Sequence, residues 1–361
     1  MVEGNKNHYA PSEVSPPGET LREILAERGM TQADLAERTG RPKKTINEII
    51  KGKTAITTET ALQFEMVLGV PANFWNRREL HYREYLEARE ERARLEKHSK
   101  WVKRFPVAAM ARRGWIEKHG DKAAQLKELL QFFGVASPEQ WEAVYARQQV
   151  AFRRSAKFKP DQAAMAAWLR QGVRQAEALA CKPYSKRRFL KTLREVRRLT
   201  RQGPEAFVPA LGRLCAEAGV AVVFVPEMRG SRASGATRWL MPGKAMIQLS
   251  LRYKTDDHLW FTLFHESAHI LLHGKRAIFI EGAEAHGQEE EEADRFAADS
   301  LIPPEQFKAI ARRSRFSLGD LRSLARQLGI APGILVGRLQ HEGLLPQTHG
   351  NRLKQRLEWA A

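Results

Sequence analysis

The sequence is poor in cysteine, in long apolar runs and in acidic residues. Its 361 residues include only Cys181 and Cys215, which fit a reducing cytosol better than a disulfide framework and are interpreted as buried thiols. No apolar run reaches the roughly eighteen residues of a membrane span. Residues 1–17 are polar and lack the apolar core of a signal peptide, so we expect a cytoplasmic protein with a disordered tail.

The shortage of acidic residues leaves a net charge of +18, from 60 Lys and Arg against 42 Asp and Glu. Such an excess attracts polyanions, usually nucleic acid, although it reads no base sequence. The charge is uneven, because residues 186–201 hold eight basic residues and one acid, and residues 281–299 hold eight acids and one base. The basic segment predicts either a nucleic-acid surface or a solvated helix face.

Apolar periodicity and glycine or proline stops predict a mainly α-helical protein with a small β-sheet, an α+β fold. The expected parts are a disordered tail (1–17), a compact block of five helices (18–87), a helical basic middle region (88–204), a C-terminal domain (205–345) and a polar tail (346–361).

The C-terminal domain is expected to begin with a helix at 205–218, followed by a buried strand at 220–225. Residues 227–236 have the composition of a loop, and two further strands are expected at 237–241 and 245–251. The next two helices would run from Asp256 or Asp257, acting as the cap, to His273, and from about Gln288 to Leu301.

The first of these two helices contains His265-Glu266-Ser267-Ala268-His269, an H-E-x-x-H motif. Two histidines four residues apart on a helix are separated by about 400° and roughly 6 Å, so both imidazoles can bind one cation. Glu266 lies between them, outside the ligand set, where it can take a proton from water at the metal. The flanking residues are apolar, and polar groups in such a helix are costly unless they coordinate or pair.

A third metal ligand is expected among Glu289–Glu292. Only Glu290 has a carboxylate four residues on, at Asp294, which can orient a ligand histidine through its ring N–H. The other three glutamates are expected to be solvated. His273 drifts about 80° from His265 around the helix and is interpreted as a supporting or structural residue.

Three protein ligands and an open position are typical of a catalytic zinc, and Mn²⁺ fits the same donors. Such a site favours peptide hydrolysis with Glu266 as general base, a gluzincin-like arrangement. His286, His258 and Tyr253 are the candidates for the donor that stabilises the oxyanion, and the sequence does not choose among them. Each of the three also has a structural interpretation.

Residues 265–274 and 290–297, with the strand at 247–252 and the helix entry at 260–264, resemble the ImmA/IrrE family of metallopeptidases. The resemblance covers roughly residues 205–345. It implies zinc-dependent cleavage of a helix-turn-helix repressor that controls phage-like elements or stress genes, and it also places the third ligand on Glu290. Many members carry Asn where this chain has Asp294, a difference that should not affect zinc binding.

In the N-terminal block, residues 29–40 have the helix-forming segment between glycine stops that is typical of a helix-turn-helix. Ile46, Ile49 and Ile50 form an apolar stripe on the next helix. The opposite face can enter a major groove, the alternative being a solvated face of a small bundle. That face carries Lys43, Lys44, Thr45, Asn47 and Lys51.

This block resembles the XRE/Cro family, specifically its HigA-type antitoxin subgroup, through residues 31–36, 46–53, 56–57, 61–62 and 68–69 together with Trp75. The resemblance implies that Gln32 contacts phosphate and that a homodimer binds a palindromic operator. Residues 318–341 show a second pattern that resembles a helix-turn-helix. For this segment we favour a role in core packing over a second contact with DNA or protein.

The preferred hypothesis is a DNA-binding regulator fused to a zinc endopeptidase that cleaves a regulatory protein, either a helix-turn-helix repressor or the chain itself. It would be a cytoplasmic, nucleoid-associated protein of bacterial or phage-related origin, without a membrane partner. The alternative is a HigA-like antitoxin or transcription factor whose metallopeptidase domain is a sensor with little proteolysis. The intact Glu266 argues against the alternative, because a sensor needs no general base.

Overall fold

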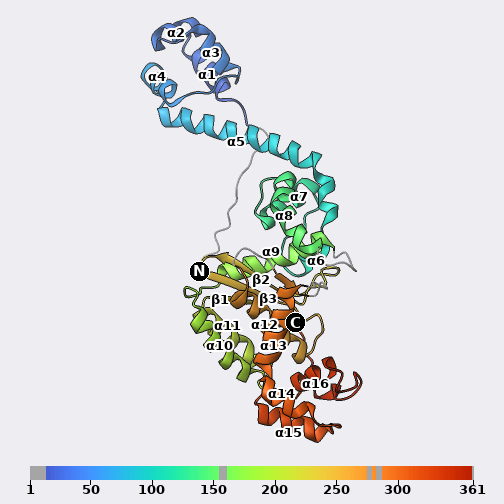
Figure 1. Ribbon diagram of the computed structural model, residues 1–361. Coiled ribbons are helices and arrows are strands. Elements are labelled where there is room, and N and C mark those ends of the chain that lie inside the picture. Colours follow the sequence, from blue (N-terminus) through green and yellow to red (C-terminus); the bar gives the residue numbers. More distant parts are fainter. Residues whose placement is uncertain (1–13, 154–160, 275–278, 282–286, 360–361) are drawn as a thin grey trace. The chain divides into compact units, whose positions relative to one another are not determined.

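The computed structural model describes residues 14–153, 161–274, 279–281 and 287–359, and the chain forms two compact units, Met1–Ser99 and Lys100–Ala361 (Figure 1). The predicted fold class, mainly α with a small β-sheet, is confirmed. No helix in the described ranges combines the length and the apolar character that crossing a membrane requires.

The N-terminal unit packs five helices around one apolar core. They are α1 (Pro17–Glu27), α2 (Gln32–Thr39), α3 (Lys43–Ile50), α4 (Thr58–Leu68) and α5 (Ala72–Lys97). Thr31 and Asp34 form a capping box at the start of α2, and Gly40 ends α2 in the left-handed conformation with φ 66°. The core consists of Leu21, Leu25, Leu35, Ala36, Ile46, Ile49, Ile56, Ala61, Phe64, Leu68, Ala72 and Trp75.

Both ends of this unit differ from the expected boundaries. The expected disordered tail was 1–17, yet Pro17 already begins α1, and residues 1–13 lie outside the described part. Helix α5 continues to Lys97, so the expected boundary after residue 87 falls inside a helix. The segment beyond residue 87 is rich in Arg and Glu, and pairs such as Arg92 with Glu96 at 3.1 Å support a helix that buries only Leu95 there.

The second unit starts with a helical part and ends with a mixed one. The first part comprises η1 (Ser99–Arg104), α6 (Val107–Arg112), α7 (Lys122–Phe133), α8 (Pro138–Arg153), α9 (Gln162–Ala178) and α10 (Lys186–Leu199). The second comprises α11 (Pro204–Glu217), β1 (Val220–Phe224), β2 (Gly235–Met241), β3 (Lys244–Leu249), α12 (Asp256–Leu272), β4 (Phe279–Glu281), α13 (Gln288–Leu301), α14 (Pro304–Ala311), α15 (Leu318–Leu328), α16 (Pro332–His341) and η2 (Asn351–Leu353).

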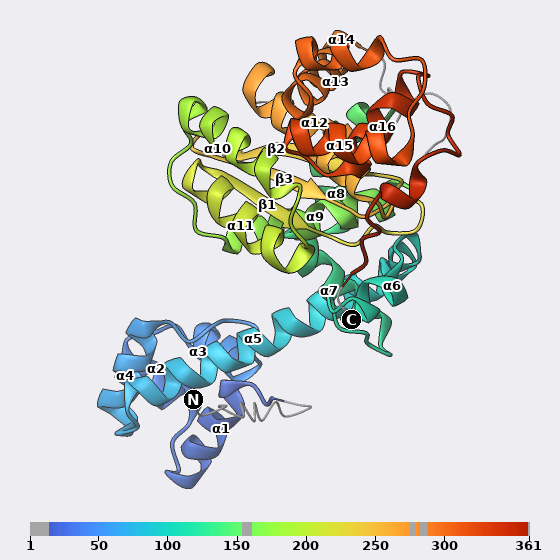
Figure 2. The same cartoon turned by 90° about the horizontal axis from the view of Figure 1, so that it is seen from below.

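The four strands form one sheet in the order β1-β3-β2-β4, with β1 parallel to β3 and the other pairs antiparallel. Figure 2 shows β1, β3 and β2 side by side. On one face, Ala245, Ile247 and Leu249 join the apolar cluster that also contains residues of α11 and α12. On the other face, the buried Gln248 side chain donates to the Trp168 carbonyl of α9 at 2.8 Å. The sheet is therefore covered by helices on both faces.

The expected boundary at residue 204 separates elements that pack together, because α9 covers one face of the sheet and α10 belongs to the core on the other face. Trp168 of α9 donates to the carbonyl of Val225, and Phe189 and Val196 of α10 belong to the same cluster as α12. The sequence did not predict that α10 joins this core, because residues 186–201 are mostly basic and only one side of α10 is apolar.

The start of α12 is built differently from the expected aspartate cap. Thr255 precedes the helix without a side-chain cap, and both Asp256 and Asp257 lie in its first turn. A segment expected to be a polar tail supplies the missing contacts. Gln355 exchanges hydrogen bonds with Asp256 through its backbone, and Lys354 pairs with Asp257 at 2.7 Å. We call residues 350–357 the C-terminal strap.

The second helix-turn-helix pattern, residues 318–341, lies in the core of this unit. Ser317 and Asp320 form a capping box on α15, and Gly329 turns the chain in the left-handed conformation. Most of α16 is buried, and Gly333 approaches Asp256 so closely that a Cβ would lie 2.4 Å from its carboxylate. Since the helix in the recognition position is packed against α12, this segment serves the fold, as favoured from the sequence.

Candidate metal centre and nucleic-acid interface

Helix α12 carries His265, Glu266 and His269 on its buried side. These three residues are 3%, 0% and 2% exposed. Glu266 faces β2 at Gly235, where a Cβ would lie 2.7 Å from Glu266 Oε1, so only glycine leaves room for this carboxylate. Thr237 of the same strand donates to the Glu266 carbonyl at 3.1 Å. These contacts with the sheet fix the position of the H-E-x-x-H helix along β2 and the direction in which Glu266 points.

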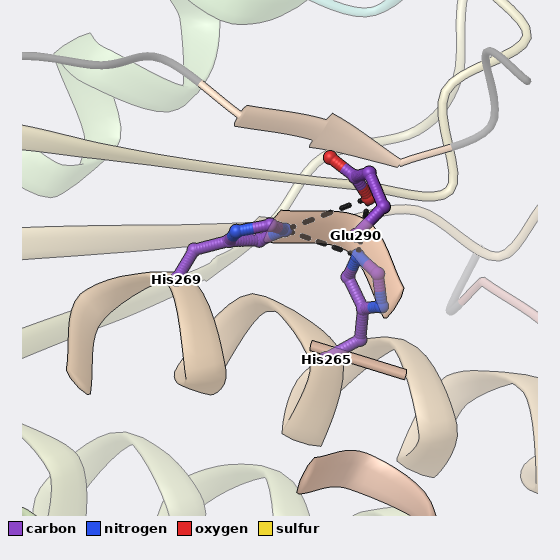
Figure 3. A group of neighbouring side chains, drawn as sticks. All are labelled: His265, His269 and Glu290. Carbon is purple, nitrogen blue, oxygen red and sulfur yellow. Dashed lines mark hydrogen bonds and ion pairs between the residues drawn. The ribbon is translucent and has the colours of Figure 1, made fainter. Parts of the chain in front are cut away.

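Helix α13 brings the third donor to α12. Ala293 and Ala297, both 0% exposed, allow the two helices to approach closely, as their small side chains suggested. Figure 3 shows His265 and His269 on successive turns of α12 with Glu290 facing both. One ligand atom from each of the three lies within 4.8 Å of the others.

The distances within this triad fit a common cation. His265 Nε2 lies 3.1 Å from His269 Nε2 and 3.1 Å from Glu290 Oε2, and His269 Nε2 lies 3.7 Å from Glu290 Oε2. Two donors bound at about 2.0–2.1 Å to one tetrahedral ion are about 3.4 Å apart. Three atoms that are all electron-pair donors converge at this spacing, so the donor set fits a zinc-like ion.

The protonation states also suit a metal ligand set. Burial lowers the pKa of His269, which favours the neutral imidazole that coordinates metals. Burial alone would raise the pKa of Glu290, but hydrogen bonds with His265 and His269 outweigh it and bring that pKa down to about 2. Near neutral pH the group therefore offers a carboxylate and at least one neutral imidazole.

Each histidine of the triad contacts another side chain through its second ring nitrogen. His265 Nδ1 lies 2.8 Å from Asp294 Oδ1, one turn after Glu290 on α13. His269 Nδ1 lies 2.8 Å from His273 Nδ1, and His273 Nε2 lies 3.4 Å from Glu292. Glu292, expected to be solvated, thus contacts His273, whereas Glu289 and Glu291 are exposed as expected.

Sequence reasoning missed Phe279, which lies on β4. Its ring stacks on His269 with centroids 4.0 Å apart and an interplanar angle of 10°. The aromatic face therefore packs flat against the imidazole. The apolar run at residues 277–280 was the available signal, but three residues of strand are too few for a periodicity to show.

A cavity of about 600 Å³ includes Asp294, the residue that contacts His265. Phe261 and Ile334 line its apolar part. Two of the three oxyanion candidates, Tyr253 and His258, also line it and stack on each other with ring centroids 4.2 Å apart. His286, the third candidate, lies outside the described residues. A cavity with apolar walls and a few polar groups can receive a substrate side chain.

The predicted DNA-facing residues lie on α2 and α3 of the N-terminal unit, with Lys51 directly after the end of α3. Gln32 and Asn47 come together, with Asn47 Nδ2 donating to Gln32 Oε1 at 3.2 Å. Lys43, Lys44 and Lys51 are exposed, and Thr45 is partly exposed. Lys44 Nζ lies 3.9 Å from Glu48 Oε1. This is a long and weak surface ion pair, which a DNA phosphate could displace.

Two family models match the chain. Residues 215–340 match the family described as the IrrE N-terminal-like domain, a peptidase family, and residues 21–75 match the helix-turn-helix family. None of the curated proteins matches the chain at a significant level.

Several solved structures share a small part of the chain. A putative antidote protein of a plasmid maintenance system from Nostoc punctiforme is 25% identical over 23% of this chain and 91% of its own, with a TM-score of 0.23. An addiction module antidote protein of the HigA family from Coxiella burnetii is 26% identical over 24% and 94%, with a TM-score of 0.22. The antitoxin GraA is 25% identical over 22% and 87%, also at 0.22.

At such TM-scores these likenesses support no functional assignment, and the two family matches carry the identification. They agree with both resemblances inferred from the sequence. The chain joins a helix-turn-helix DNA-binding domain to a domain of the IrrE N-terminal-like peptidase family.

Proposed function

We propose that this protein is a transcriptional regulator whose second unit is a zinc-dependent endopeptidase. Its substrate would be a regulatory protein, either a helix-turn-helix repressor or the chain itself, in a stress or phage-related response. The observation that carries the proposal is the convergence of His265, His269 and Glu290 beside the buried Glu266. Three protein donors leave one position for water or substrate, which is the arrangement of catalytic zinc sites.

A zinc ion held by this triad would polarise a peptide carbonyl and make nearby water more acidic, and Mn²⁺ could be held by the same donors. The chain itself supplies the proton transfers. Glu266, one residue after His265, would take a proton from the attacking water and deliver it to the leaving amine. Asp294 and His273 would keep the two imidazoles oriented through their ring N–H groups. Tyr253 and His258, which line the adjacent cavity, are the candidates for stabilising the oxyanion.

The DNA-binding unit would locate the operator. Lys43, Lys44 and Lys51 would contact phosphates, and the Gln32–Asn47 pair would place Asn47 against a base edge. We further propose that the protein binds a palindromic operator as a homodimer. Exposed apolar side chains on α4 and α5 support this, above all Met66, which is 82% exposed.

The test is to incubate wild type and Glu266→Gln with candidate helix-turn-helix repressors in the presence of zinc or manganese. Cleavage by wild type and none by the variant, with equal operator binding, is the expected result. If neither protein cleaves any candidate while both bind the operator, the sensor hypothesis replaces the peptidase. Proteomics of cells expressing either form would identify the cleaved repressor, and products of this chain itself would reveal self-cleavage.

A further inference from the structure

Helix α10 of the peptidase unit presents a stripe of positive charge. Arg187, Lys191, Arg194 and Arg198 are all exposed. Their spacing of four, three and four residues places them within about 60° of one another on a helix, over a length of roughly 16 Å. We call these four residues the α10 stripe. Lys186, Arg188 and Arg201, which are also exposed, flank it.

The orientation of this helix is fixed by its opposite face. Phe189, Leu193 and Val196 are buried in the core that also holds α12. Ser185 caps the helix by accepting from the Arg188 backbone N–H. The α10 stripe therefore cannot rotate inward, and its cations stay on the surface.

One arginine of the helix shows what a structural role looks like here. Arg197 donates to the carbonyls of Leu301 and Leu328, at 2.9 and 2.8 Å, and so joins the ends of α13 and α15. Within the described part of the chain, none of the four stripe residues has such a bond or an ion pair. The only acid on the helix is Glu195. Arg197 therefore stabilises the fold, whereas the four residues of the α10 stripe make no such contact with the described residues and are available to a binding partner.

The chemistry of the α10 stripe selects the phosphate backbone of duplex DNA. A duplex carries one negative charge per roughly 1.7 Å, so about ten phosphates lie along 16 Å. Arg and Lys can bind guanine edges as well as phosphates, but the stripe lacks the Asn, Gln, Asp or Glu that would read the other bases, so we expect it to contact mainly phosphate. An anionic membrane is a weaker match, because the apolar face that such a helix would insert is already buried in the core.

We propose that the α10 stripe is a second, sequence-independent DNA-binding surface, located on the peptidase unit itself. This goes beyond operator recognition by the helix-turn-helix and does not depend on proteolysis. Two DNA-binding surfaces in one chain would lengthen its residence on DNA, because the second contact forms while the first is held.

The test compares full-length wild type with a variant in which all four stripe residues are changed to Gln. The affinity for a random-sequence duplex of about 30 base pairs is measured against salt concentration. Each phosphate contact contributes about 0.9 to the slope of log K against log salt. Losing four contacts should reduce that slope by about 3 to 4 and lower the affinity at least tenfold.

A matched control removes the same charge elsewhere on the unit by changing the exposed and scattered Lys103, Arg112, Lys118 and Lys127 to Gln. This control should change the slope by less than about 1. Replacing the three arginines of the stripe by Lys should retain the wild-type slope, which separates loss of charge from damage to the fold. Equal slopes for the stripe variant and the control would overturn the proposal. So would a loss confined to RNA or to vesicles containing anionic lipid, with duplex binding unchanged.

Discussion

The candidate metal centre and the proposed recognition face of the helix-turn-helix are opposite kinds of site. Around the metal centre, His265 and His269 are buried and each is held by a further side chain, Asp294 or His273. On the recognition face, the lysines are exposed, and the contact between Gln32 and Asn47 is the main internal bond. A catalytic site must be rigid before its substrate arrives, whereas a DNA-reading face receives most of its partners from the DNA.

The largest effect should follow from removing a metal ligand. His265→Ala leaves two donors and should abolish both bound metal and peptidase activity. The loss of metal affinity should exceed the roughly 100-fold that changes behind a ligand can cause. Elemental analysis of the purified protein measures it. Unchanged metal content would refute the ligand assignment, and unchanged operator affinity serves as the control for folding of the DNA-binding unit.

A smaller effect, limited to turnover, should follow from Glu266→Gln. The amide has the same shape as the carboxylate and fits beside Gly235, so metal should stay bound. Without the general base, the cleavage rate should fall by about 10²- to 10⁴-fold. Single-turnover cleavage assays with metal content measured in parallel would show it. A variant that cleaves at the wild-type rate would remove Glu266 from the mechanism.

Asp294 tests how much the support behind a ligand matters. Asp294→Ala should lower metal affinity or activity by about 10- to 100-fold, because His265 loses the group that orients its ring. Asp294→Asn keeps a hydrogen-bond acceptor and should recover most of the loss. Competition with a fluorescent zinc chelator provides the measurement, and equal losses in both variants would show that the carboxylate charge, rather than a hydrogen-bond acceptor alone, is required.

The smallest effect is expected on the recognition face. Asn47→Ala should weaken operator binding by about tenfold, near the lower end of the roughly 1–3 kcal/mol that a base contact contributes. Metal content and cleavage rate should not change. Fluorescence anisotropy with operator and random duplexes would separate the effects, since loss of a base contact should weaken only the operator complex. Equal weakening on both duplexes would assign Asn47 to the phosphate backbone.

The parts of the site that the sequence allowed us to predict are those set by a single helix. The period of the α-helix brings His265 and His269 together and distinguishes Glu290 from its three glutamate neighbours, because only Glu290 has Asp294 one turn on. Gly235 and Phe279 could not be found in this way. Their contacts with Glu266 and His269 depend on strand pairing between β2 and β4, which no local pattern in the sequence specifies.

The same reason explains why some expected boundaries differ from the elements of the structure. The expected boundaries at residues 87 and 204 were drawn where composition changes. Helix α5 continues through the first because charged pairs and the buried Leu95 support its extension, and α10 shares the core on the far side of the second. The segment after residue 345 looked like a polar tail, yet Leu357 is 3% exposed. Burial of a few apolar residues among many charged ones is decided by tertiary contacts.

The C-terminal strap has a consequence for the order of events during synthesis. The DNA-binding unit closes its core with residues 21–75, so it can fold as soon as they leave the ribosome. The first turn of α12 instead waits for Gln355, which lies 99 residues after its partner Asp256. The nascent chain can therefore complete the core of its helix-turn-helix before the first turn of α12 is anchored.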